Sequence, residues 1–237
     1  TTGRTKMETM VKTDGIQVIV GPEVSSVCEV AVQYGAENKI PFITPSATAS
    51  VLSEMNGTEW LFRTVPTDDL QSQVLAGLIM EGNYTRLATI AINNTYGVGL
   101  ADGVVDALEA AGWNGTVVTQ VVYEEDAEEY HAELQQIKDS DPDAVFACTY
   151  DYDGMMIFAQ AADMGLDKDS HGNKIAWFGC DGNASPSISE SPESAEFLNE
   201  TFVAGTIVGV AGPIYDDFMV RFQDTFGEYP AAYSSTT

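Results

Sequence analysis

Polar side chains suited to binding a small charged molecule recur at one kind of place in this sequence, directly after short apolar runs. Such runs are typical of strands buried in a parallel sheet, and ligands bind beyond the carboxyl ends of these strands. Hydroxyls, phenols and an acid follow five of the runs. The candidate site residues are Ser25, Ser26, Ser46, Ala47, Thr48, Tyr96, Tyr150 and Asp181.

The chemistry of these residues matches a zwitterion. A helix start offers unsatisfied N–H groups and a partial positive charge, so Ser25, Ser26 and Thr48 suit a carboxylate. Asp181 is a fixed negative charge that suits an ammonium group, and tyrosines supply apolar walls with polar tips. Together they predict a site for an α-amino acid.

Each residue taken alone also has a plainer interpretation. Ser25 or Ser26 is equally suited to be a helix N-cap, Asp181 to be one more surface acid, and Tyr96 to belong to the core. Their shared position after strands favours the binding site. Cys28, Cys148 and Cys180 are isolated, without a C-x-x-C pair, so we expect buried thiols rather than a zinc or redox site.

The elements that must position these residues alternate along the chain. We expect strands at Ile16–Val20, Pro41–Thr44, Leu61–Thr64, Leu87–Asn93, Val117–Tyr123, Ala144–Thr149, Ile175–Gly179 and Thr206–Val210. Helical spacing and length predict helices at Ser26–Lys39, Leu70–Gly82, Gly97–Gly112, Asp126–Ser140, Gly154–Gly165 and Tyr215–Gly227. The alternation predicts an α/β fold in which helices flank parallel sheets.

Two extended segments, 62–69 (FRTVPTDD) and 205–212, read as crossovers between two lobes. We therefore expect a first lobe of residues 1–65 and 211–237 and a second of residues 66–210. The second lobe holds a complete βα series. The first has few strands, so we expect it to be truncated at both ends, which would expose a sheet edge.

The chain is acidic throughout. It has 237 residues, 44% of them hydrophobic, with 36 Asp and Glu against 10 Lys and Arg and a formal net charge of −26. This charge repels nucleic acid and anionic lipid, so we expect neither as a partner. Because the acids are dispersed rather than gathered in a tail, they indicate a halophilic, haloarchaeon-like source whose salt screens the repulsion.

Motifs for catalysis or a nucleotide cofactor are missing. Gly97 and Gly99 lack the third glycine of G-x-G-x-x-G, and neither a phosphate-binding loop nor G-x-S-x-G occurs. His131 and His171 have no plausible nucleophile beside them. We expect no enzyme, no cofactor and no metal, although a nucleotide-dependent enzyme is the rival from another functional class.

Six Asn-x-Ser/Thr sequons favour a glycosylated protein outside the cell: Asn56, Asn83, Asn93, Asn114, Asn183 and Asn199. No apolar run is long enough for a membrane helix. We expect the full-length protein at the cell surface on a lipid anchor that lies outside this chain.

Six ordered segments resemble one family. IVGPEVSS, IPFITPSATAS, FRTVPTDDLQ, LATIAINNTYGVGLADG, DPDAVFACTYD and FGCDGNAS are similar in order and spacing to the substrate-binding proteins of ABC importers for branched-chain amino acids. The resemblance covers about residues 14–233. It implies a type I periplasmic-binding-protein fold, in which two Rossmann-like lobes close on a ligand, and an ABC transporter permease in the membrane as partner.

The resemblance also implies roles for the candidate residues. Ser25 and Thr48 match residues that hold the ligand carboxylate. The backbone carbonyl of Ser46 and the acid at Asp181 match the ammonium site, and Tyr96 and Tyr150 match lining residues of the other lobe. Two positions depart from the family, which more often has glutamate at 181 and alanine at 46. An amide, urea or short-peptide binding protein, or a ligand-sensing receptor domain, therefore remains an alternative.

Overall fold

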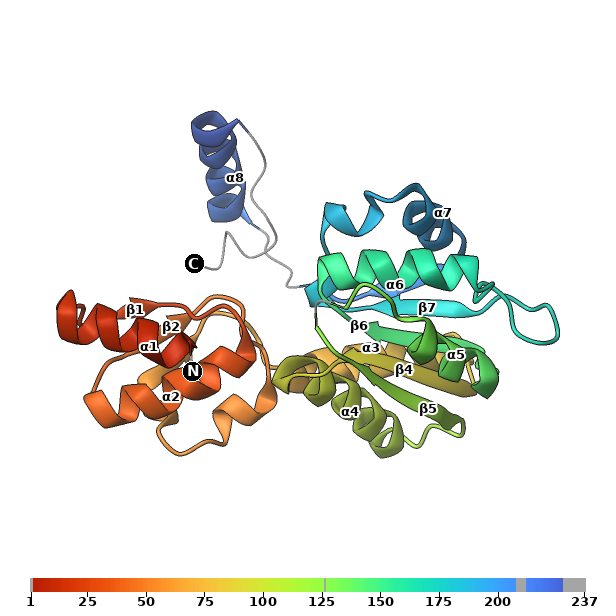
Figure 1. Ribbon diagram of the computed structural model, residues 1–237, viewed down its shortest axis with the longest axis horizontal. Helices are drawn as coiled ribbons and strands as arrows, with labels where there is room; N and C mark the ends of the chain where they lie inside the picture. The colour runs from red at the N-terminus through yellow and green to blue at the C-terminus, as the bar shows by residue number, and fades with distance from the viewer. Residues whose placement is uncertain (1, 126, 208–211, 228–237) are drawn as a thin grey trace. The chain divides into compact units, whose positions relative to one another are not determined.

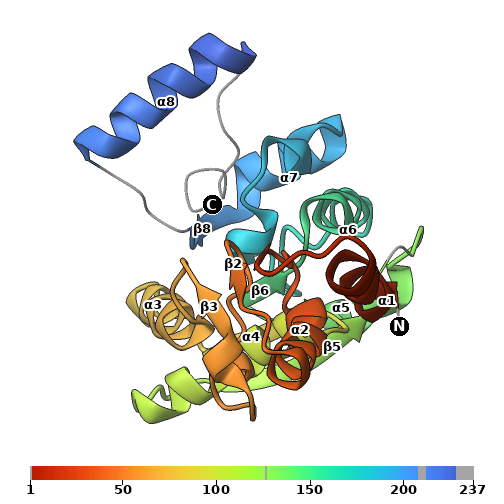
Figure 2. The same ribbon diagram turned by 90° about the vertical axis from the view of Figure 1, so that its left-hand side faces the viewer.

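The computed structural model describes residues 2–125, 127–207 and 212–227. The chain divides into two compact units, one of residues 1–68 with 208–237 and the other of residues 69–207 (Figures 1 and 2). Within the described residues no helix combines the length and apolar composition needed to cross a bilayer. Each unit is built on its own parallel sheet.

The unit of residues 69–207 carries a five-stranded sheet in the order β5-β4-β6-β7-β8, with every neighbouring pair parallel. Its strands are β4 (Arg86–Ile92), β5 (Thr116–Tyr123), β6 (Ala144–Cys148), β7 (Ala176–Gly179) and β8 (Phe202–Gly205). The next strand along the chain, β5, pairs with one edge of β4, and β6 pairs with the opposite edge. The order therefore reverses between β4 and β6, the place where doubly wound sheets bind ligands.

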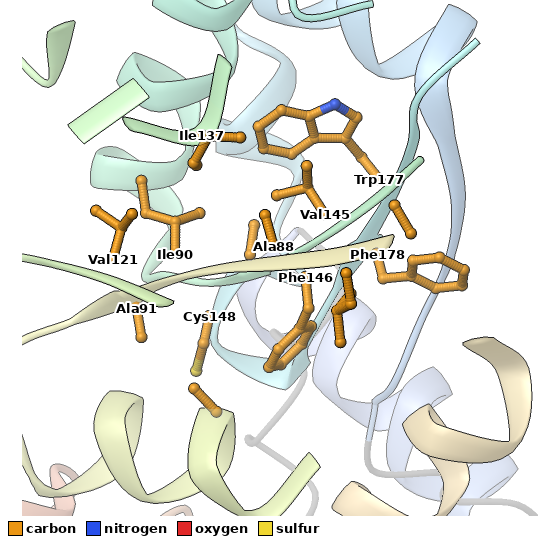
Figure 3. Packing of buried hydrophobic residues seen from close by; sticks show 14 of the residues in the cluster. Ala88, Ile90, Ala91, Val121, Ile137, Val145, Phe146, Cys148, Trp177 and Phe178 are labelled. Atoms are coloured by element: carbon orange, nitrogen blue, oxygen red, sulfur yellow. The ribbon is translucent and has the colours of Figure 1, made fainter. Parts of the chain in front are cut away.

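Helices cover both faces of this sheet. They are α3 (Asp68–Glu81), α4 (Thr95–Ala110), α5 (His131–Ser140), α6 (Asp151–Asp163) and α7 (Pro192–Thr201), with the 3₁₀ turns η4 (Asp181–Asn183) and η5 (Pro186–Ser189) before α7. Figure 3 shows Val145 and Trp177 on the face of Ile137 from α5, and Phe146 and Cys148 on the opposite face. Both faces are therefore apolar, as the continuous strand runs predict.

The other unit has a three-stranded parallel sheet of β1 (Ile19–Val20), β2 (Phe42–Thr44) and β3 (Leu61–Arg63). Its helices are α1 (Thr2–Glu8), the π-helix η1 (Thr9–Thr13), α2 (Ser25–Asn38), the 3₁₀ turns η2 (Ser50–Ser53) and η3 (Thr58–Trp60), and α8 (Pro213–Phe226). Its core consists of two small clusters, one around Phe42 and Tyr34 and one around Cys28 and Leu52.

Most predicted elements occur with boundaries shifted by one to three residues, and several predictions were wrong. Residues 206 and 207 are not a strand, and the rest of the predicted segment Thr206–Val210 lies outside the described residues. Among the described residues the last strand is β8, which follows α7 without a loop, and neither α7 nor α1 was predicted. The helix predicted from Asp126 begins only at His131, and residues 16–18 do not belong to β1.

All three cysteines are buried thiols, as expected. Burial raises the pKa of the Cys28 thiol to about 11, which keeps it protonated and unreactive.

Candidate functional site

The carboxyl ends of β4, β6 and β7 bring Tyr96, Tyr150 and Asp181 together. The phenol of Tyr96 donates to Asp181 Oδ1 over 2.7 Å. The rings of Tyr96 and Tyr150 stack with centroids 5.7 Å apart and planes inclined by 7°. Tyr96 follows β4 and Tyr150 follows β6, so the stacked pair lies where the strand order reverses.

Asp181 is a buried carboxylate, 6% exposed, and it accepts from two neutral donors through the same oxygen. Besides Tyr96, the side-chain amide of Gln71 donates to Asp181 Oδ1 over 2.7 Å. The Tyr96 oxygen in turn accepts from the backbone N–H of Gly182 over 3.0 Å. Two neutral donors to one oxygen fix the carboxylate in position without neutralising its charge.

Local sequence explains why Tyr96 reaches this place. Asn94 caps α4, its side-chain oxygen accepting from Gly97 N over 2.9 Å. The helix starts so close to β4 that a Cβ at Gly97 would collide with the backbone and side chain of Ile92. Asn94 Nδ2 also donates to the Tyr150 phenol over 3.3 Å, so one residue positions both tyrosines.

The turn η4 that carries Asp181 is held by Asn183. Its oxygen accepts from Cys180 N over 3.0 Å, and its Nδ2 donates to Ala147 O and Thr149 Oγ1 at 3.0 and 3.2 Å. Gly182 fits beside it because a Cβ there would meet Thr149 O and Tyr96 Oη, each at 2.7 Å. The acid is therefore fixed by contacts to β6 as well as to Tyr96.

Both phenols stay protonated near neutral pH. Burial raises the pKa of Tyr96 well above its ordinary value, and the negative charge of Asp181 adds to the rise. Burial also raises the pKa of Tyr150. These side chains can thus donate hydrogen bonds and offer apolar ring faces, but they do not act as bases.

In the other unit, the predicted hydroxyls lie at the start of α2 and in the loop after β2. Ser25 is 2% exposed, and its oxygen accepts from Ala49 N over 3.4 Å. The N-cap of α2 is Val24, so neither Ser25 nor the partly exposed Ser26 has that role. Ser25 instead occupies the first helical position, where the helix dipole favours a negative charge.

The loop after β2 contains Ser46, Ala47 and Thr48. Ser46 Oγ donates to Glu23 O over 2.8 Å, and Ala47 N donates to Thr44 Oγ1 over 3.1 Å. The hydroxyl of Thr48 is buried and, within the described residues, has no hydrogen-bond partner. A buried hydroxyl without a partner is costly, and a ligand oxygen would satisfy it.

Arg63 was not among the predicted site residues, yet it holds this loop. Its Nη1 donates to the carbonyls of Ala47, Thr48 and Ala49 at 3.3, 3.1 and 3.1 Å, and its Nη2 donates to Ser53 Oγ over 2.5 Å. Gln71 was missed as well. Both lie within the FRTVPTDDLQ segment. For Arg63 the sequence offered one signal, since a basic residue is uncommon in a chain with only ten Lys and Arg.

In the part of the chain that the structure describes, His, Cys, Asp and Glu side chains do not gather in threes as they would around a metal ion.

Comparison with known proteins gives a consistent result. The family model described as "Receptor family ligand binding region" matches residues 1–236. The Leu/Ile/Val-binding protein BraC3 of Rhizobium johnstonii is 32% identical over 152 residues, which are 64% of this chain and 41% of that protein. This chain therefore spans less than half of that relative.

Solved structures share the fold. A leucine-binding protein, LivK, from Thermotoga maritima superposes with a TM-score of 0.84 at 19% identity, covering 99% of this chain and 64% of that one. A solute-binding protein of an ABC transporter from R. palustris, solved with benzoate, gives 0.82 at 16% identity, covering 99% and 62%.

Proposed function

We propose a function from one premise: this chain belongs to the family described as the receptor family ligand binding region. Its fold is the predicted one, the two-lobed α/β fold of type I periplasmic binding proteins. From this premise we infer that the protein binds a branched-chain α-amino acid outside the cell. It then delivers the amino acid to an ABC permease. The protein binds a solute and does not transform it.

The observation that carries this proposal is the buried Asp181 carboxylate at the end of β7, fixed by Tyr96 and Gln71. A charge held in a buried position by neutral donors suits a cation that arrives with the ligand. The flat faces of Tyr96 and Tyr150 beside it suit an apolar side chain.

The hydroxyls of the other unit complete the chemistry. Ser25, at the first position of α2, and the buried Thr48 hydroxyl suit the ligand carboxylate. Ser26, Ser46 and Ala47 supply neighbouring backbone and hydroxyl groups.

The names of known proteins favour this ligand. BraC3 is named for leucine, isoleucine and valine, and the T. maritima protein for leucine. One neighbour was solved with benzoate, which makes an aromatic carboxylate a second candidate. Benzoate has no ammonium group, so it would leave the Asp181 charge unused.

Calorimetry on the full-length protein in high salt tests the proposal, with the twenty amino acids, benzoate, acetamide and urea as ligands. We expect heat with leucine, isoleucine or valine and none with benzoate. Binding of benzoate alone would make an aromatic carboxylate the ligand in place of an amino acid. Binding of acetamide or urea alone would make an amide or urea the ligand. A thermal shift with ATP or NAD, and none with any amino acid, would contradict the proposal.

A further inference from the structure

Gln71 lies close to both places where the chain passes from one unit to the other. The unit of residues 69–207 begins two residues before Gln71 and ends one residue after Thr206. Thr206 Oγ1 donates to Gln71 Oε1 over 2.9 Å, across 135 residues of sequence. A single side chain therefore ties the beginning of this unit to its end.

The same amide reaches the candidate ligand acid. Gln71 Nε2 donates to Asp181 Oδ1 over 2.7 Å. An ionised carboxylate accepts hydrogen bonds and does not donate them, so the NH₂ group of Gln71 must face Asp181 and its oxygen must face Thr206. The orientation of the amide follows from its partners, and the three side chains form one directed series, Thr206 to Gln71 to Asp181.

We infer that Gln71 is a positioning residue that couples the charge state around Asp181 to the two segments joining the units. Gln71 holds the Asp181 carboxylate in the position in which a cation can bind it. A cation bound there therefore stabilises the same placement of Gln71, and with it the hydrogen bond that Gln71 accepts from Thr206. By linkage, holding Thr206 in turn changes the affinity of Asp181 for the cation. The role of the ligand in this inference rests on the proposed function; the link from Gln71 to Thr206 does not.

Hydrogen exchange on the ligand-free chain tests the link. In Gln71→Ala we expect backbone amides of residues 202–207 to exchange about 10-fold faster, the factor that corresponds to losing a hydrogen bond in a charged network. Thr206→Val, nearly equal in shape, is expected to have the same effect on this segment. Circular dichroism verifies that both variants are folded.

Gln135→Ala is the matched control. Gln135 Nε2 donates to Asp139 Oδ1 over the same 2.7 Å, but on the exposed surface of α5. We expect exchange at 202–207 to be unchanged in this variant. Unchanged exchange in folded Gln71→Ala would overturn the inference.

Two ligands that differ only in the amino group test the coupling to charge. Leucine has an ammonium group, and 4-methylpentanoate is the same molecule without it. We expect Gln71→Ala to weaken leucine binding about 10-fold. 4-Methylpentanoate cannot use the Asp181 charge and binds much more weakly, so it is titrated at higher concentration, and there we expect Gln71→Ala to leave its affinity within about twofold. In an Asp181→Asn background the leucine effect of Gln71→Ala should disappear.

Equal weakening for both ligands, or an effect that persists beside Asn at 181, would mean that Gln71 only stabilises the fold, and the coupling would be wrong. If the unmodified protein binds no amino acid, the proposed function fails, and the exchange experiment still decides whether Gln71 links the two segments.

Discussion

Asp181 accepts two hydrogen bonds through one oxygen in a buried position. Burying this charge costs desolvation free energy, and a cation from the ligand would offset that cost. Replacing it with asparagine keeps the shape and removes the charge. We expect Asp181→Asn to weaken amino-acid binding about 30-fold or more, since losing one partner of a desolvated charge pair costs about 2 to 5 kcal/mol.

Calorimetry measures this loss. Asp106→Asn is the matched control, because Asp106 lies exposed on α4 and the same charge is removed from the surface. Affinity unchanged in Asp181→Asn would remove this residue from the binding site.

The buried phenols predict how stability depends on pH. Burial raises the pKa of Tyr96 and of Tyr123, and nearby Asp181 and Asp153 raise them further. In the unfolded chain these phenols ionise near pH 10, whereas in the folded chain they stay neutral. Their contribution to stability is therefore complete below pH 10 and is lost as the pH rises above it.

Urea unfolding at pH 8, 10 and 11 measures this effect. Above pH 10 we expect each such phenol to remove about 1.4 kcal/mol of unfolding free energy per pH unit. Tyr123→Phe removes one of these phenols, so above pH 10 the unfolding free energy should fall by about 1.4 kcal/mol less per pH unit. An equal slope in this variant would show that Tyr123 ionises freely in the folded chain, against the prediction.

At the residue scale, position after a strand was enough to identify Tyr96, Tyr150 and Asp181 as neighbours. It could not identify Gln71 or Arg63, because neither follows a strand. Gln71 reaches Asp181 across 110 residues, and most of the Arg63 contacts are to backbone carbonyls. Sequence patterns contain no sign of such contacts, which depend on how elements pack.

At the scale of elements, the long apolar strands were the easiest to predict, since β4 and β6 are buried along nearly their whole length. Helix α7 was missed because its buried face includes two hydroxyl residues. Ser194 Oγ donates to Ile188 O and Thr201 Oγ1 to Phe197 O, so polar residues are buried where the pattern requires apolar ones. β8 was misplaced because Phe202 ends α7 and begins the strand, without a turn to separate them.

The loop after β2 offers a test at this scale. Arg63→Ala removes the donor of three carbonyl contacts, and the loop that carries Thr48 should become less ordered. We expect a loss of about 2 kcal/mol in unfolding free energy, as for hydrogen bonds from a charged group. Hydrogen exchange should rise at residues 46–49.

Arg221→Ala is the comparison for this change. Arg221 forms an exposed ion pair with Asp217 within α8, a kind of pair that contributes little. A loss in Arg63→Ala no larger than in Arg221→Ala would contradict the role of Arg63 in holding the loop.

At the scale of the whole molecule, the excess of acid governs stability. With a net charge of −26 and ion pairs that are mostly exposed in the described ranges, repulsion between carboxylates is not balanced by local pairing. Salt screens this repulsion over a Debye length of about 3 Å at 1 M. We expect the melting temperature to rise by about 5 to 10 °C between 0.1 M and 2 M KCl.

Circular dichroism during heating measures the rise. Sucrose at matched osmolality is the control, because it favours compact states without screening charge. A melting curve that does not move with salt, or that moves equally with sucrose, would mean that the charges are already compensated within the fold.

The way Asn183 is bonded has a practical consequence for producing this protein. Its amide nitrogen, the atom to which an oligosaccharide would be attached, is buried and already donates to β6. An oligosaccharyltransferase can reach it only before this part of the chain has folded. In a eukaryotic secretory host, sugar transfer and folding would compete at this position, and molecules modified there would be retained by quality control rather than secreted.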